Sequence, residues 1–147
     1  MVVYVNKDVY RYSNLLSKFA WRHGGTQMDT IREQKLEALR TAVEYLEKLI
    51  PAMEEVISEI KGEMKEDTVD FLLQIIDGFN FMIETYNVTR DIVNDPEMLI
   101  NDDELEKTVG ELSNGFSRKD YPAIANELES DIIPFLKVFK EAASRIA

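Results

Sequence analysis

The chain has no cysteine among its 147 residues and only one histidine. The absence of cysteine excludes disulfides and thiolate chemistry, and it weakly favours a cytoplasmic protein. His23 alone cannot form the histidine pairs of zinc or di-metal centres. Because it lies between Arg22 and Gly24 at an expected helix end, we interpret it as a solvated end residue. We therefore expect no metal site.

The sequence also lacks long apolar runs and glycine-rich phosphate loops. No stretch reaches the ~18 apolar residues of a membrane span, and Lys7 and Asp8 interrupt the start, where a signal peptide would be apolar. No serine lies in a Gly-x-Ser-x-Gly setting, and Gly24 with Gly25 fits neither the dinucleotide nor the Walker pattern. We predict a non-enzymatic protein that uses no cofactor and spans no membrane.

An acid-rich stretch, residues 91–106, invites a calcium-site interpretation. Counted as an EF-hand loop from Asp91, it puts Val93 at a ligand position and Pro96 where glycine is required. We reject that interpretation, because acidic residues at this place complement the positive end of a helix that starts near residue 101.

Basic residues are scarce after residue 35, so the charge is divided unevenly. Residues 1–35 carry six basic and three acidic groups, a net charge of +3, whereas residues 36–147 carry 11 basic and 25 acidic groups, a net charge of −14. An acidic body repels phosphate backbones and anionic bilayers, so neither nucleic acid nor a membrane is an expected main partner. Acidity also needs no partner to explain it, since it keeps a protein soluble.

Apolar side chains at helical spacing are abundant. One face of residues 36–64 stays apolar throughout, at Leu36, Leu39, Val43, Leu46, Ile50, Met53, Ile57, Ile60 and Met64. Asp29 is the expected N-cap of this first helix, and Gly62 marks the turn after it. Pro51 lies inside the helix, and because the apolar spacing keeps its phase there, we predict a bend and not a break.

A second helix is predicted over residues 68–93, and it is more apolar than one face requires. Eleven of the 18 residues from 69 to 86 are apolar or tyrosine. This surplus indicates either a central helix or an interface. Gly78 in the middle costs about 1 kcal/mol relative to alanine, which is tolerable where another backbone approaches closely. Simple drift explains the glycine equally well.

Two further helices complete the pattern. Asn101 has the position of an N-cap for a third helix that ends near Gly115, and Asp120 caps a fourth that continues to residue 146. Pro134 is expected to kink the fourth helix as Pro51 kinks the first. Four amphipathic helices joined by short turns predict an all-α, antiparallel four-helix bundle. We expect a single domain, residues 1–147, in which residues 29–147 are the acidic bundle.

Residues 1–28 form a basic, aromatic head in this prediction. Residues 2–12 are rich in β-branched and aromatic side chains around a possible two-residue turn, which suggests a short β-hairpin or an extended arm. Ser13 or Asn14 then caps a short helix that Gly24 helps to end. An isolated two-stranded ribbon is only marginally stable, so the head must lie on the bundle or pair with a second chain.

Two surfaces are candidates for recognising another protein. One is the surplus apolar face of the second helix, with Phe71, Ile75, Gly78, Phe81 and Met82. The other is the head, which has the aromatic and arginine mixture of interface cores, with Tyr10, Tyr12, Trp21, Arg11 and Arg22. Plain burial, in the helical core or at one end of the bundle, accounts for both sets as well.

Our leading hypothesis is an adaptor or chaperone-like module that binds another protein by helix-in-groove packing or by self-association. One form of it is a homodimer in which the basic head of one chain binds the acidic body of the other. One alternative is a nucleic-acid-associated regulator that uses the basic head. Another is a small-molecule sensor with a pocket between the helices that contain Pro51 and Pro134.

Overall fold

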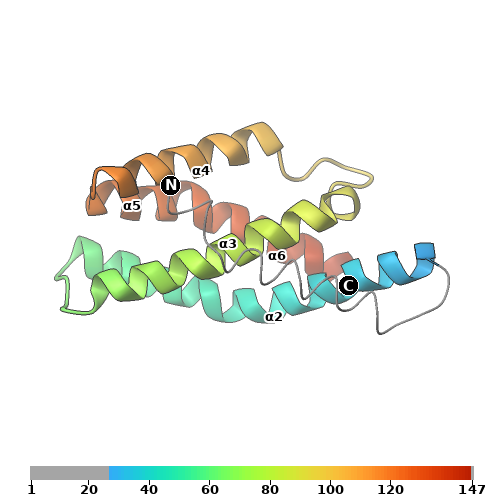
Figure 1. Cartoon of the computed structure of the whole chain (residues 1–147), viewed down its shortest axis with the longest axis horizontal. Coiled ribbons are helices and arrows are strands. Elements are labelled where there is room, and N and C mark those ends of the chain that lie inside the picture. The colour runs from blue at the N-terminus through green and yellow to red at the C-terminus, as the bar shows by residue number, and fades with distance from the viewer. Residues whose placement is uncertain (1–26, 147) are drawn as a thin grey trace.

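The computed structural model describes residues 27–146, and every regular element within them is helical (Figure 1). The elements are α2 (Gln27–Lys61), α3 (Thr68–Val93), α4 (Asp102–Ser117), α5 (Tyr121–Glu127), the π-helical segment η1 (Leu128–Ile132) and α6 (Ile133–Ile146). The all-α prediction is confirmed for this part of the chain. The predicted hairpin and short helix of the head lie outside the described residues. Among the described helices, none combines the length and the hydrophobicity that crossing a bilayer requires.

α2 begins at Gln27. The prediction that Asp29 caps this helix is therefore wrong, because Asp29 lies within its first turn. The helix ends at Lys61, and Met64, the last predicted member of the apolar face, is 40% exposed. α2 continues through Pro51 without a break, as predicted.

The buried face of α2 is wider than the predicted stripe. Most of the predicted positions are buried, and so are four neighbouring ones, Ala38, Ala42, Leu49 and Val56. The reason is that α2 packs against α3, α6 and α5, so that more than one stripe of the helix is covered. Each fully buried side chain of leucine size contributes about 1.5–3 kcal/mol to folding.

α3 supplies the centre of the core because it also packs against α6. Phe79 and Tyr86 of α3 are fully buried. Phe135 meets both rings edge-on, at centroid distances of 6.4 and 5.9 Å, and Phe139 meets Tyr86 at 5.9 Å. Contact with two helices explains why α3 carries more apolar residues than one face needs.

Gly78 is a packing requirement of the contact between α2 and α3. A Cβ atom added there would collide with the hydroxyl of Tyr45 and lie 3.0 Å from Cδ1 of Leu49. The Tyr45 ring is itself held by an edge-on contact with Phe81, at a centroid distance of 5.3 Å. The sequence predicted that another backbone approaches closely at Gly78, whereas in the structure the nearest atoms belong to side chains of α2.

The N-caps of α4 and α5 are those predicted from the sequence. Oδ1 of Asn101 accepts hydrogen bonds from the N–H groups of Asp103 and Glu104, at 2.9 and 3.2 Å. Oδ1 of Asp120 accepts one from the N–H of Ala123, at 3.1 Å. Each bond satisfies a backbone donor that the first turn of a helix leaves free.

The fourth predicted helix changes its winding just before Pro134. In η1 the N–H of Ile133 donates to the carbonyl of Leu128, five residues earlier. Pro134 has no N–H, and its ring excludes the carbonyl of Ser130 from its usual α-helical position. The irregularity predicted at Pro134 therefore takes the form of a π-helical turn between α5 and α6.

Candidate functional site

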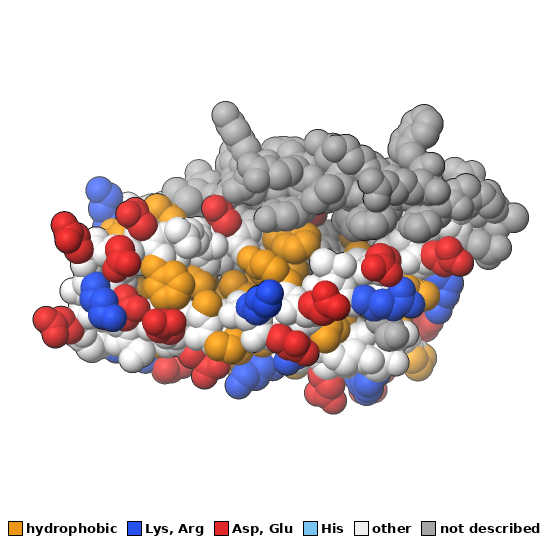
Figure 2. Space-filling view, turned by 90° about the horizontal axis from the view of Figure 1, so that it is seen from below, with side chains coloured by type: hydrophobic (Ala, Val, Ile, Leu, Met, Phe, Trp, Pro, Cys, Tyr) orange, Lys and Arg blue, Asp and Glu red, His pale blue; other side chains and the backbone are white. Residues whose placement is uncertain are grey.

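The interface residues predicted on α3 do not form an exposed patch. Ile75, Gly78 and Met82 are buried, while Phe71 and Phe81 are half-buried. The predicted head residues, Tyr10, Tyr12, Trp21, Arg11 and Arg22, lie outside the described residues. Figure 2 shows one face of the molecule, where charged side chains are interspersed with small hydrophobic patches. A hollow that combines apolar and charged side chains is therefore the better candidate for a binding site.

Such a hollow lies between α4 on one side and η1 with α6 on the other, and we call it the α4–α6 groove. Its volume is about 470 Å³. Its apolar lining comes from Leu99, Ile100, Leu105, Pro134, Phe135 and Val138, and its charged lining from Glu104, Lys107, Glu111 and Asp131. Leu105 and Phe135 are half-buried, and Val138 is 39% exposed. The groove thus presents an apolar floor with mostly acidic walls.

The end of α4 nearest α5 is fixed by a Schellman turn. The N–H of Asp120 donates to the carbonyl of Gly115 at 2.9 Å, and the N–H of Lys119 donates to the carbonyl of Phe116 at 3.1 Å. Lys119 has a φ of 52°, in the left-handed region that favours glycine. A Cβ added at Gly115 would lie 3.0 Å from Cγ1 of Ile124, so the glycine lets α4 and α5 pack closely.

The opposite end of α4 is fixed to α3 by a hydrogen-bonded cluster around Tyr86. The Tyr86 hydroxyl donates to Oδ1 of Asp102 at 2.6 Å and accepts from Nδ2 of Asn94 at 3.1 Å. Arg90 donates to Oδ2 of Asp102 at 2.8 Å, and its guanidinium lies 5.7 Å from the centre of the Tyr86 ring. Burial, together with the Asp102 carboxylate, raises the pKa of Tyr86 to about 12. The hydroxyl therefore stays a donor over the whole physiological range.

These two attachments explain why a groove exists. α4 packs closely on α5 and η1, whereas its contacts with α3 and α6 are few. In Figure 1, α4 runs alongside the other helices as a separate rod, joined to them by turns at its two ends. Among residues 27–146, α4 buries one face at Leu112 and Gly115, and the described residues leave the side that faces α6 open.

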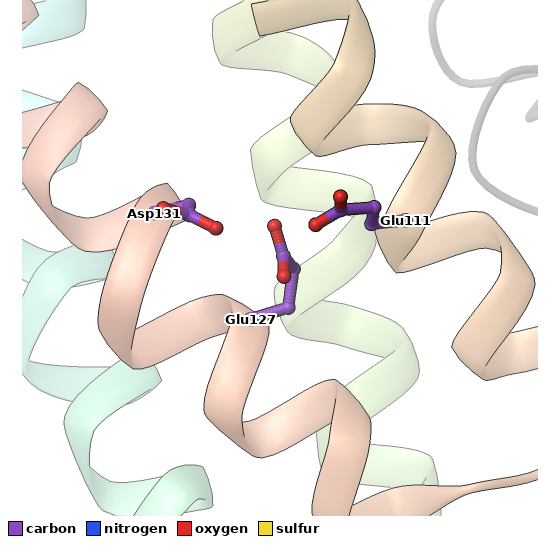
Figure 3. Close-up of side chains that lie close together, drawn as sticks. All are labelled: Glu111, Glu127 and Asp131. Atoms are coloured by element: carbon purple, nitrogen blue, oxygen red, sulfur yellow. The ribbon is translucent and has the colours of Figure 1, made fainter. Parts of the chain in front are cut away.

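Three carboxylates from three elements meet beside the groove (Figure 3). Glu111 of α4, Glu127 of α5 and Asp131 of η1 each place a carboxylate oxygen within 4.8 Å of the others. Burial, and then the neighbouring carboxylates of Asp131 and Glu111, raise the pKa of Glu127 to about 8. At neutral pH the cluster therefore retains a proton on Glu127.

A proton on one of the three carboxyl groups explains how they can form hydrogen bonds with one another. Oε1 of Glu127 is buried and has no hydrogen-bond partner among the described residues. Two carboxylates can hydrogen-bond to each other only when one of them is protonated, and its raised pKa makes Glu127 the member of the cluster that favours the proton. The arrangement lets Glu127 donate to Asp131 or Glu111, which otherwise repel each other.

Carboxylate oxygens are also the ligands that Mg²⁺ and Ca²⁺ prefer, so these three residues could contribute to a cation site. Such ions usually take six or more oxygen ligands, and binding one here would have to displace the proton of Glu127. Glu111 and Asp131 lie on the surface, where acidic groups often gather without an ion. The cluster is therefore explained by a shared proton.

The two prolines that marked the predicted sensor pocket border different hollows. Pro134 lines the α4–α6 groove, whereas Pro51 lines a second hollow of about 480 Å³ between α2 and α6. A third hollow of about 520 Å³ lies between α3 and α4, with Ile83, Leu105 and Val109 in its lining. Leu105 therefore faces hollows on both sides of α4.

Sequence reasoning did not find the three clustered carboxylates. Glu127 and Asp131 are four residues apart, which places them on one helical face, and this signal was available. Glu111 belongs to another helix, so its place beside them depends on how α4 and α5 pack. The sequence predicts many paired carboxylates and does not tell which of them a third one joins.

Comparison with known proteins identifies the chain by family. Neither the curated proteins nor the solved structures include a match to it. One family model, described as a domain of unknown function (DUF8042), matches residues 37–142. This range runs from the third turn of α2 to the last turns of α6, and it contains the whole α4–α6 groove and the carboxylate cluster. The chain therefore belongs to the DUF8042 family.

Proposed function

We propose that the protein is a non-enzymatic interaction module, an antiparallel helical bundle that binds a cationic, amphipathic segment of another protein in the α4–α6 groove. One observation supports this most directly: an apolar floor made by Leu105, Phe135 and Val138 lies beside the acidic side chains of Glu111 and Asp131. The cytoplasm remains our expected location for it.

The chemistry of the groove selects the kind of partner. Interfaces that recognise a helix or peptide bury apolar anchors in the middle and keep charged groups at the rim. Here the groove's charged lining has three acidic side chains and one basic side chain, Lys107. A partner segment therefore needs apolar residues for the floor and arginine or lysine for the rim.

Photo-crosslinking in cells tests the proposal. A photoreactive amino acid replaces Val138, which is 39% exposed in the groove, and in a matched protein it replaces Leu73, which is 40% exposed on α3. We expect a protein partner to be captured at residue 138 and not at residue 73. The partner is then purified, and its binding to Glu111→Gln/Asp131→Asn is measured. Equal capture at both positions, or binding unaffected by the charge removal, would contradict the proposal.

The hollow itself also favours one alternative, a small-molecule sensor, because about 470 Å³ is within the size of ligand pockets. A ligand that binds the folded state raises the melting temperature. A thermal-shift screen with metabolites on the wild-type and Val138→Asp proteins distinguishes the two functions. A stabilising compound whose effect disappears in the variant supports the sensor and not the protein partner.

A further inference from the structure

The part of the chain that precedes the described helices has the composition that the α4–α6 groove requires. Residues 1–26 contain four basic residues, one acidic residue and five aromatic residues. Residues 27–147 contain 13 basic and 27 acidic residues, so the two parts have net charges of +3 and −14. The chain therefore holds both a cationic aromatic segment and a groove with an apolar floor and acidic walls.

Charge complementarity is strongest at one end of the groove. Glu111 and Asp131 line the groove there, and Glu127 is adjacent to both, so three carboxylates lie within 4.8 Å of one another. An ammonium or guanidinium group brought to this place would reduce the repulsion that a shared proton now relieves. The apolar side chains of Phe135 and Val138 are next to it along α6 and offer contact area for an aromatic ring.

The connection to α2 lets residues 1–26 reach the groove of the same molecule. Lys35, near the start of α2, forms an ion pair with Asp91 at 3.0 Å, and the preceding residue, Arg90, binds Asp102 at the start of α4. The start of α2 therefore lies toward the same end of the molecule as the loop between α3 and α4 (Figure 1). Twenty-six residues span up to about 85 Å when extended, which exceeds the roughly 50 Å length of α2.

We propose that residues 1–26 bind in the α4–α6 groove of their own chain, with aromatic side chains on the apolar floor and basic side chains beside Glu111 and Asp131. This rests on the groove being the interaction surface of the proposed function. A tethered segment has a local concentration in the millimolar range, which favours the same molecule over a second copy. A partner protein that uses the same groove would then compete with this segment.

The tryptophan content of the chain makes this proposal directly measurable. Trp21 is the sole tryptophan and belongs to the proposed occupant. Its fluorescence is recorded in the full-length protein with Val138→Asp, which puts a charge on the groove floor, and with Leu73→Asp, which puts one at an equally exposed site on α3. Circular dichroism is used to check that both variants keep the helical fold.

We expect the Trp21 emission to shift to longer wavelength, and iodide quenching to increase, in Val138→Asp and not in Leu73→Asp. Glu111→Gln/Asp131→Asn should shift it in the same direction, and added salt should do so in the wild type, because screening weakens charge pairs. Identical spectra for both aspartate variants would overturn the proposal. A signal that depends on protein concentration would overturn it too, because it would mean that the segment binds a second copy.

This result is separate from the test of the proposed function. Capture of a partner at residue 138 with no change in Trp21 emission would support the proposed interaction module and contradict binding of residues 1–26 in the groove. A shift of Trp21 emission with no captured partner would support the intramolecular contact and contradict the proposal that the groove binds another protein.

Discussion

Two glycines show how the same residue has opposite roles in neighbouring helices. Gly78 in α3 leaves no room for a Cβ, because Tyr45 and Leu49 of α2 occupy the space. Gly110 in α4 borders the hollow between α3 and α4, and within the described part of the chain no atom beyond its own stretch of helix lies within 4 Å of an added Cβ. The first is required by packing, and the second carries only the cost of a flexible residue in a helix.

Replacing each glycine by alanine separates these roles. Gly78→Ala should lower the free energy of unfolding by about 1–3 kcal/mol, because the core must shift to admit the methyl group. Gly110→Ala should raise it by up to about 1 kcal/mol, because alanine favours the helix. Chemical denaturation of both variants checks this. If Gly78→Ala proves as stable as the wild type, the packing assigned to this contact is wrong.

Lys119 is the residue most clearly strained by its place in the chain. Its φ of 52° suits glycine, and the left-handed conformation costs other residues about 1–2 kcal/mol. Lys119→Gly should therefore raise the free energy of unfolding by about 0.5–1 kcal/mol after the entropy cost of glycine is subtracted. Lys119→Ala is the control, because alanine bears the same strain and should bring no comparable gain. Thermal unfolding distinguishes the two.

Because of Glu127, the free energy of unfolding depends on pH, and the sign of this dependence follows from the raised pKa of its carboxyl group. The pKa is raised from 4.5 to about 8 in the folded protein, so between these values the folded state binds more protons than the unfolded state. Its contribution to stability is fully present below about pH 4.5 and is lost as the pH rises to about 8. Glu127→Gln should remove this decline, because the amide stays neutral.

Melting curves between pH 5 and 9 for the wild type and two variants test this assignment. Glu129→Gln serves as the control, since Glu129 is exposed and pairs with Lys61 at 2.8 Å on another face. The expected result is a flatter profile for Glu127→Gln alone. A profile parallel to that of the wild type would show that Glu127 titrates normally.

At the scale of elements, α4 depends on the attachments at its two ends more than on contacts along its length. Tyr86 is part of the attachment between α4 and α3. Its hydroxyl forms hydrogen bonds with Asp102 and Asn94, and its ring packs on Phe135. The side chain therefore links the position of α4 to the aromatic core beneath the groove.

Tyr86→Phe removes the hydroxyl and keeps the ring. The loss of hydrogen bonds to a charged partner should cost about 1.5–3 kcal/mol of stability. Hydrogen exchange should become faster in the first turns of α4, while the turn between α4 and α5 keeps its protection. A uniform increase in exchange over the whole chain would instead mean that the cluster stabilises the fold as a unit.

At the scale of the whole molecule, periodicity and caps predicted the helices of the described part to within a few residues. Asn101 and Asp120 were identifiable because a cap acts on its own first turn. The interface residues on α3 were less predictable, because an apolar surplus fits a central helix and an exposed face equally well. Only the packing of α3 against both α2 and α6 shows that Ile75 and Met82 are core residues.

The groove could not be predicted from the sequence either, because it too depends on how the helices pack. Its walls come from α4, η1 and α6, and its width depends on the Schellman turn at Lys119 and on the cluster at Tyr86. Neither the left-handed lysine nor the contact between residues 86 and 102 leaves a recognisable local signal. Charge could be predicted, since the acidic excess after residue 35 is a property of composition.

The most direct test of the α4–α6 groove as an interaction surface is the equilibrium affinity of a purified partner, once crosslinking at residue 138 has captured one. Titration calorimetry compares the wild type with Val138→Asp and Leu73→Asp, whose wild-type side chains are 39% and 40% exposed. We predict that Val138→Asp weakens binding by about tenfold or more, equivalent to about 1.4 kcal/mol, and that Leu73→Asp leaves the affinity unchanged. Equal affinities for all three proteins would contradict the account.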